Sequence, residues 1–218
     1  MYNKSKNGFT LAEVLITLVI IGVVAALTIP TAISKYKEQE LKSQFAKAYS
    51  AISQAINKTN KIDFYGYARC YYDSSHDQNA VYYTTVDCHS FYTTLTKNLG
   101  TQKICMNNSL ADGCVPVYQN YNSACGAYSE DSINNTNTSY VLAGGQILIM
   151  YGYYGAPLFL LDINGHKGPN VPGKDLFGFM LKKDDYNVYL DGNEGCFEPV
   201  SGGRTTNEMI RYSLSGTK

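Results

Sequence analysis

The chain has 218 residues, enough for one or two small domains with one modest hydrophobic core. Lysine and arginine together number 18, as do aspartate and glutamate, and the net charge of zero excludes a global attraction to nucleic acids or anionic membranes. Apolar residues are concentrated before residue 35, whereas the later chain is rich in Tyr, Asn, Gly, Ser and Thr. The N-terminal region is therefore suited to an apolar environment, and the rest of the chain is suited to water.

A stretch long enough to cross a membrane follows a short, positively charged N-terminus. Lys4 and Lys6 precede it, and residues 14–33 carry no charged side chain. About 20 apolar residues in a helix span the hydrocarbon layer of a bilayer. No cleavage site of small residues follows, and flanking lysines favour the cytoplasmic side. The sequence therefore predicts a single retained span of the cytoplasmic (inner) membrane, with the rest of the chain outside the cytoplasm.

The helical pattern continues beyond this stretch. Apolar residues recur at intervals of three or four, or their sum, at Ile33, Leu41, Phe45, Ala48, Ile52 and Ile56. The spacing predicts one helix from Phe9 to about Asn60, with a membrane half at 9–33 and an amphipathic half at 34–60. Gly22 and Pro30 are its weak points, and Pro30 is expected to kink it because proline lacks a backbone N–H.

Residues 61–218 are expected to form a globular head. An even number of cysteines after a membrane segment predicts disulfides in an oxidising compartment. These cysteines are Cys70, Cys88, Cys105, Cys114, Cys125 and Cys196. Residues 62–140 are predicted to be mostly loops, with one short helix over Phe91–Leu99. Four or five antiparallel strands are expected between residues 140 and 200. They correspond to two strands about Gly144-Gly145, then Pro157–Ile163, Leu176–Lys182 and Asn187–Gly192.

Glu13 lies at the edge of the apolar stretch, where a carboxylate is costly unless it is paired. It is part of a recognisable combination, in which a Lys-bearing leader ends in Gly8 and is followed by Phe9, Thr10, Leu11, Glu13, Gly22 and Pro30. With this combination the sequence resembles the type IV pilin superfamily, which comprises type IV pilins and the pseudopilins of type II secretion. The resemblance covers about the first 55 residues.

The resemblance implies a pilin-like α+β fold: a long N-terminal helix packed on a C-terminal antiparallel sheet, with Cys-rich loops between them. It also implies that a prepilin peptidase removes residues 1–8 by cutting between Gly8 and Phe9, and then methylates the Phe9 nitrogen. Subunits would assemble with other copies or related pilins into a helical fibre, helped by an inner-membrane assembly platform. Glu13 would then pair with the N-terminal ammonium of a neighbouring subunit, which offsets the cost of a charge in an apolar core.

The expected function is that of a structural subunit of a type IV pilus-like or type II secretion pseudopilus fibre in the cell envelope or on its surface. No GxSxG, P-loop or HExxH motif is present, which argues against an enzyme. Two alternatives stay open: a signal-anchored binding protein that never assembles, and a minor pilin that binds a ligand or DNA. The head has no run of Lys or Arg beyond Lys182-Lys183, which argues against nucleic acid.

One loop could bind calcium. In "DINGHKGPNVPGKD", Asp162, Asn164 and Asp175 offer oxygen ligands, and Gly165 permits a sharp turn. The loop lacks the closing acidic residue of an EF-hand, although some pseudopilins bind calcium in a C-terminal loop. The favoured alternative is a rigid connection whose Asp and Asn side chains cap their own backbone, with no cofactor at all.

Overall fold

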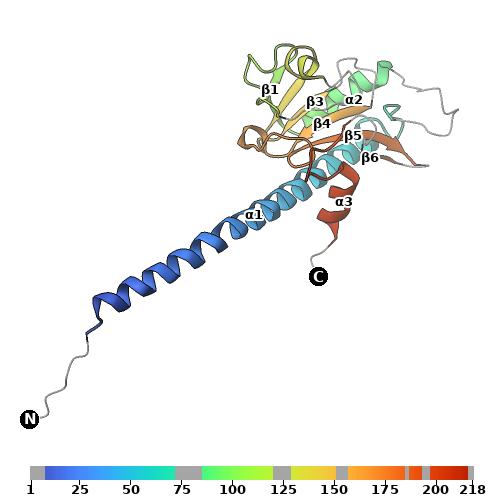
Figure 1. Cartoon of the computed structure of the whole chain (residues 1–218). Helices are drawn as coiled ribbons and strands as arrows, with labels where there is room; N and C mark the ends of the chain where they lie inside the picture. The colour runs from blue at the N-terminus through green and yellow to red at the C-terminus, as the bar shows by residue number, and fades with distance from the viewer. Residues whose placement is uncertain are drawn as a thin grey trace, which may run out of the picture. The chain divides into compact units, whose positions relative to one another are not determined.

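The computed structural model describes residues 8–71, 85–119, 129–150, 157–184, 187–192 and 197–215. The chain divides into two compact units, Met1–Glu40 and Leu41–Lys218, and the boundary falls within the first helix (Figure 1). This helix, α1, spans Leu11–Lys58 and continues as one π-helical turn, η1, at Thr59–Asp63. The long helix predicted from the spacing of apolar residues is thus present.

In the N-terminal unit, α1 passes Gly22 and Pro30 without ending. Pro30 cannot donate to the carbonyl four residues earlier, as any other residue in a helix would. Nearby, the Thr28 hydroxyl donates to the Val24 carbonyl at 2.9 Å, so this polar side chain is hydrogen-bonded to the backbone of its own helix. Between residues 14 and 33 the side chains of this helix are mostly apolar and almost all exposed.

The second unit is built on one antiparallel sheet. In the described part of this unit, the sheet has six strands in chain order, each paired with the next. They are β1 (Thr101–Cys105), β2 (Ser139–Leu142), β3 (Ile147–Met150), β4 (Leu158–Asp162), β5 (Leu176–Lys183) and β6 (Val188–Gly192). The helical segments are α2 (Thr85–Asn98), η3 (Ser132–Thr136), η4 (Gly165–Lys167) and α3 (Thr206–Leu214).

Both faces of this sheet are covered, which explains why its central strands read as continuous apolar runs. Alternate residues of a strand point to opposite faces. In β3, Leu148 and Met150 join a core with the second half of α1 and with α2. Ile147 and Ile149 join a smaller core on the other face, which includes Val115, Tyr118, Ile133, Leu160, Leu176 and Phe197.

The second half of α1 packs on the sheet through its apolar stripe. Phe45, Ala48, Ile52, Ala55 and Ile56 are its buried residues, and all lie at helical spacing. The Phe45 ring meets the edge of the Phe177 ring of β5, with centroids 4.8 Å apart. This contact joins the helix to β5, the strand before the last in the sheet.

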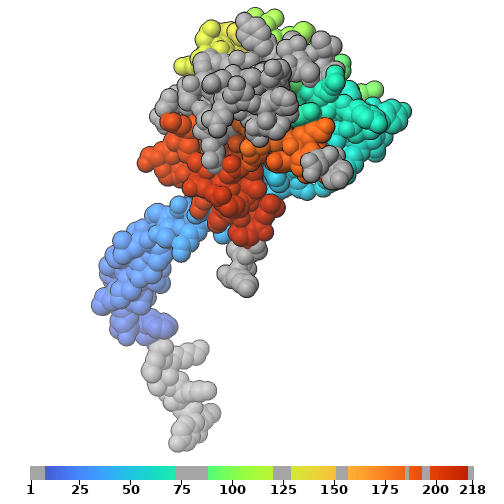
Figure 2. Space-filling model, turned by 90° about the vertical axis from the view of Figure 1, so that its right-hand side faces the viewer, coloured from blue at the N-terminus to red at the C-terminus, as the bar shows by residue number. Residues whose placement is uncertain are grey.

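The C-terminal helix α3 lies beyond the last strand expected from the sequence. Met209 buries its side chain in the larger core, and in Figure 2 the red residues near the C-terminus lie beside orange residues from earlier in the chain. Two cations flank the Tyr212 ring: Lys42 Nζ lies 4.2 Å and Arg204 Cζ 4.1 Å from its centroid. Tyr212 therefore ties α3 to the start of this unit.

The α+β fold class predicted from the sequence is present, with a long N-terminal helix, an antiparallel sheet and disulfide-bonded loops. The expected short helix begins earlier, at Thr85. The estimate of four or five strands was low for the described residues because β1 lies within the region predicted as loops. Three of the five residues in β1 are exposed, so it lacks the buried apolar run by which the other strands are recognised.

Candidate functional site

The start of the described chain is the expected processing site. Gly8 and Phe9 precede the first helical residue, Leu11, and 90% of the Phe9 side chain is exposed. A Cβ placed on Gly8 would meet no atom within 4 Å. Neither packing against the described residues nor a left-handed backbone thus requires glycine at position 8. The lysine-bearing part of the leader, residues 1–7, lies outside the described residues.

Glu13 forms a closed ring of hydrogen bonds with Thr10. The Thr10 backbone N–H and its hydroxyl both donate to Glu13 Oε2 at 2.8 Å. In return, the Glu13 N–H donates to the Thr10 hydroxyl oxygen at 3.3 Å. This is a capping box, in which residues three apart satisfy each other's free backbone donors at a helix start. The carboxylate therefore has partners within its own chain.

Beyond Glu13, α1 exposes an apolar surface without a covering partner in the described chain. Its large exposed side chains are Val14, Leu15, Ile16, Leu18, Val19, Ile20, Ile21, Val23, Val24, Leu27, Ile29 and Ile33. A Cβ on Gly22 would also meet open space. By length and composition α1 can cross a membrane, and it is the one such helix in the described chain. A surface this apolar requires lipid or other protein around it.

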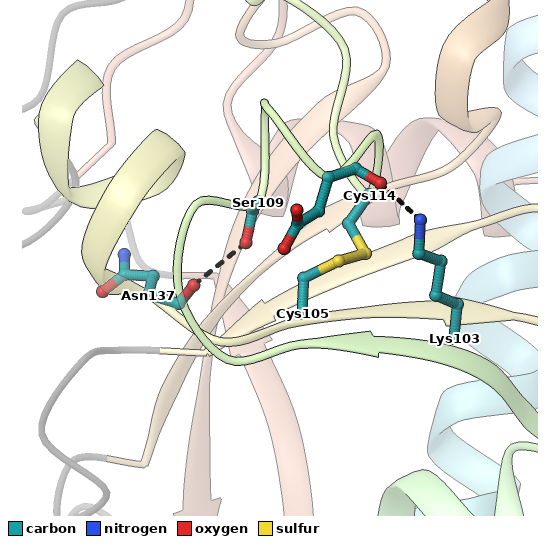
Figure 3. The surroundings of a disulfide bond; sticks show 6 residues. Lys103, Cys105, Ser109, Cys114 and Asn137 are labelled. Carbon is teal, nitrogen blue, oxygen red and sulfur yellow. Dashed lines mark hydrogen bonds between the residues drawn. A yellow bond between two sulfur atoms is a disulfide. The ribbon is translucent and has the colours of Figure 1, made fainter.

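Two disulfides cross the head. Cys70 bonds to Cys88 and Cys105 bonds to Cys114, with Cα–Cα distances of 4.6 and 6.2 Å. Figure 3 shows the second one, which closes a small loop after β1. Lys103 donates to the carbonyl of Asp112, and the Ser109 hydroxyl donates to that of Asn137 at 3.3 Å. The predicted oxidation is thus supported at four positions, while Cys125 and Cys196 lie outside the described residues.

The loop between β4 and β5 begins at a buried carboxylate, Asp162. Its Oδ1 accepts the N–H groups of Asn164, at 3.1 Å, and of Gly165, at 2.7 Å. Its Oδ2 accepts the hydroxyl of Tyr118 at 3.0 Å, from a residue 44 positions earlier. Gly165 has a φ of +64°, and a Cβ there would lie 2.2 Å from the Gly145 carbonyl oxygen. Glycine is thus required for the sharp turn, as expected.

The same loop ends at a second buried carboxylate, Asp175. Its two oxygens accept the N–H groups of Asn170, at 2.6 Å, and of Val171, at 2.8 Å. These contacts match the backbone-capping alternative considered for this loop. The buried side-chain oxygens of Asn164 and Asn170, however, have no hydrogen-bond partner. No group of three His, Cys, Asp or Glu side chains suited to a metal occurs among the described residues.

Burial, and to a smaller extent the nearby Asp175 carboxylate, raise the pKa of Asp162 to about 7 against the opposing effect of its hydrogen bonds. Burial likewise raises the pKa of Asp175. An acid whose pKa is higher in the folded state stabilises the fold fully below its ordinary value of 3.8 and loses that contribution as the pH rises through about 7.

We therefore expect the free energy of unfolding, in the presence of EDTA, to fall as the pH is raised from about 5 to about 8. Asp162→Asn should flatten this dependence, because it removes the acid whose pKa is raised to about 7. Urea unfolding of the full chain in detergent, followed by near-ultraviolet circular dichroism, measures both. Equal slopes for the two proteins would contradict the assignment to Asp162.

The residues predicted for processing, assembly and calcium binding lie in two separate parts of the structure. Gly8, Phe9 and Glu13 lie together at the helix start, with Gly22 and Pro30 further along α1. Asp162, Asn164 and Asp175 share one loop of the head. Thr10 was not predicted as the partner of Glu13, although the spacing Thr-x-x-Glu before an apolar run signals a capping box. Tyr118 was not predicted either, because no local pattern in the sequence signals it.

Comparison with known protein families gives a match at the N-terminus. Residues 3–29 match the family described as the prokaryotic N-terminal methylation motif. This motif is the signature of type IV pilins and pseudopilins, and it contains the Gly8-Phe9 junction and Glu13. No curated protein and no solved structure matches the chain. The motif therefore indicates a pilin-like or pseudopilin protein, and the head must be interpreted from its own structure.

Proposed function

We propose that this protein is a structural subunit of a type IV pilus-like fibre or a type II secretion pseudopilus. The observation that carries the proposal is the methylation motif on an exposed Gly8-Phe9 junction, directly before a helix with an uncovered apolar surface. Such a surface has two uses in sequence: a membrane anchor before assembly and a helix–helix contact within a fibre. Neither use requires catalytic residues, and a structural role accounts for the motif without them.

Gly8 supports the processing step. Since no contact with the described residues requires glycine there, its lack of a side chain suits an external partner that must approach the backbone closely. The peptidase that cuts before Phe9 is that partner. Cleavage creates a new ammonium on Phe9, and methylation of this nitrogen leaves its positive charge in place.

Glu13 supports the assembly step. It is placed three residues after Thr10, at the boundary between the processing junction and the apolar surface. In a fibre, neighbouring helices would bury this boundary, and the carboxylate would pair with the Phe9 ammonium of another copy or a related pilin. Pairing offsets the desolvation of both charges and also sets the register between subunits.

In the unassembled state, α1 would hold the protein in the inner membrane as a single span, with the disulfide-bonded head outside the cytoplasm. Disulfides persist in oxidising compartments, which supports this orientation. A non-assembling, membrane-anchored binding protein would share the same topology. It would not need cleavage before Phe9, and this difference separates the two functions.

The test is the mass of the N-terminus of the protein isolated from membranes. We expect a chain that begins at Phe9 with one added methyl group, and accumulation of the full-length precursor in Gly8→Val. Gly8→Ala is the matched control, because its small side chain should be cut more readily than valine. A wild-type protein that begins at Met1 would overturn the proposal.

We also propose that the β4–β5 loop binds calcium. Calcium prefers oxygen ligands, including carboxylates and the side-chain carbonyls of Asn. The loop offers Asp162, Asn164, Asn170 and Asp175, two of which have buried oxygens without a partner. Two buried carboxylates with raised pKa values gain most from a cation. The ion would stiffen this part of the head and would supply no chemical step.

Calcium should raise the thermal midpoint of unfolding of the full chain at neutral pH, since binding to the folded state alone stabilises it. Asp175→Asn should abolish the shift, whereas Asp112→Asn, at an exposed position elsewhere in the head, should retain it. Calorimetry in detergent with added calcium or EDTA measures the midpoints. Identical midpoints with calcium and with EDTA would leave the loop as a rigid connection only.

A further inference from the structure

We propose that Thr10 is the positioning residue that satisfies Glu13 in the lone subunit, so that assembly exchanges Thr10 for the ammonium of a neighbour. The inference rests on the proposed function. It starts from the position of the carboxylate: one of its oxygens, Oε2, takes both donors of Thr10 at 2.8 Å. The Glu13 carboxylate thus already has hydrogen-bond partners in the subunit before any fibre forms.

The head contains the same arrangement in a different setting. At the start of α3, the Thr205 N–H donates to Glu208 Oε2 at 2.9 Å, and the Glu208 N–H donates to the Thr205 hydroxyl oxygen at 3.3 Å. There the box caps a helix in water, where solvent can replace any lost donor. At Glu13 the box stands at the start of an apolar surface, where fewer waters are expected and a lost donor has no replacement.

Processing leaves the box at Thr10 intact. The expected cut is at the bond between Gly8 and Phe9, so the Thr10 nitrogen remains an amide and its N–H can still donate. The mature subunit therefore carries a new ammonium on Phe9 and a carboxylate already held by Thr10. The ammonium is available to a neighbour, and the carboxylate is kept in a defined rotamer until that exchange.

The Glu13 carboxylate would have different partners in the lone subunit and in the fibre. In the lone subunit the Glu13 carboxylate accepts two hydrogen bonds from Thr10, one from its hydroxyl and one from its backbone N–H. In the fibre the neighbour's ammonium would supply the stronger, charge-assisted partner. Removing the hydroxyl should therefore raise the free energy of the lone subunit more than that of the assembled one.

The first test measures the lone subunit. Hydrogen exchange of the N-terminal peptide is followed by mass spectrometry in the full chain, held in lipid nanodiscs. Thr10→Val keeps the branched shape and loses the hydroxyl, and its first helical turn should exchange roughly fivefold faster than wild type. Thr10→Ser should exchange like wild type. Thr205→Val is the matched control and should change exchange only at the start of α3.

A double-mutant cycle shows whether Thr10 acts through the carboxylate. In a Glu13→Ala background the Thr10 hydroxyl can still accept the N–H of residue 13 but has no carboxylate to donate to, so adding Thr10→Val should have a smaller effect than it has alone. Equal effects in both backgrounds would overturn the inference, as would wild-type exchange in Thr10→Val. Because this test needs no fibre, it can fail while the proposed function holds, and the reverse is also true.

The second test measures the exchange of partners. The quantity is the ratio of subunit in sheared fibres to mature, correctly cleaved subunit left in the membrane. Thr10→Val should raise this ratio above that of wild type and Thr10→Ser, because it penalises only the lone state. A lower ratio with normal cleavage would overturn the inference, since the hydroxyl would then be needed within the fibre.

Discussion

Glu13→Ala subunits should enter the membrane at the wild-type level and form few fibres or none. The substitution makes the N-terminal segment more apolar, so insertion should not suffer. What is lost is the partner of the Phe9 ammonium. A cation brought unpaired into an apolar helical core costs about 3–5 kcal/mol, by analogy with broken buried ion pairs. Repeated at each subunit, this cost is enough to stop polymerisation.

Two further variants separate the charge from the helix cap. Glutamine accepts the same capping hydrogen bonds at this helical position, so Glu13→Gln should keep the first turn of α1 and still assemble poorly. Glu13→Asp keeps the charge on a shorter side chain and should be intermediate. Fibre yield after shearing, with membrane fractionation as the control, measures all three. Normal fibres from Glu13→Gln would mean that Glu13 serves α1 only as a cap.

Phe177→Ala should destabilise the head by about 3–5 kcal/mol, the range for removing a buried aromatic ring. Only 1% of Phe177 is exposed, and it packs against Phe45 of α1 from the start of β5. Loss of the ring would leave a cavity and would remove the contact that joins the helix to the sheet. Marginal stability makes such a loss a large part of the total.

The matched control for Phe177 is Tyr67→Ala, which removes an aromatic ring that is 84% exposed. Its effect should stay within about 0.5 kcal/mol, as for most surface substitutions. Phe177→Leu should fall between the two because it fills part of the cavity. Urea midpoints of the full chain in detergent give the comparison. A loss in Phe177→Ala no larger than that in Tyr67→Ala would contradict this account of the core.

The features of this protein that its sequence could predict are those set by short-range patterns. The long helix follows from apolar residues at intervals of three and four, and β2 to β6 follow from short apolar runs separated by turns. The processing junction and Glu13 follow from their position before the apolar stretch, and residues 3–29 match the methylation motif. In each case the interacting residues lie within a few positions of one another, so their order in the chain carries the information.

Tertiary structure alone decided which distant residues meet. The pairing of Cys105 with Cys114, the bond from Tyr118 to Asp162, and the smaller core across the sheet depend on how the strands are arranged. The edge strand β1 is recognisable only by its pairing with β2. Many chain arrangements satisfy the same local pattern, and only the simultaneous burial of both sheet faces selects one of them.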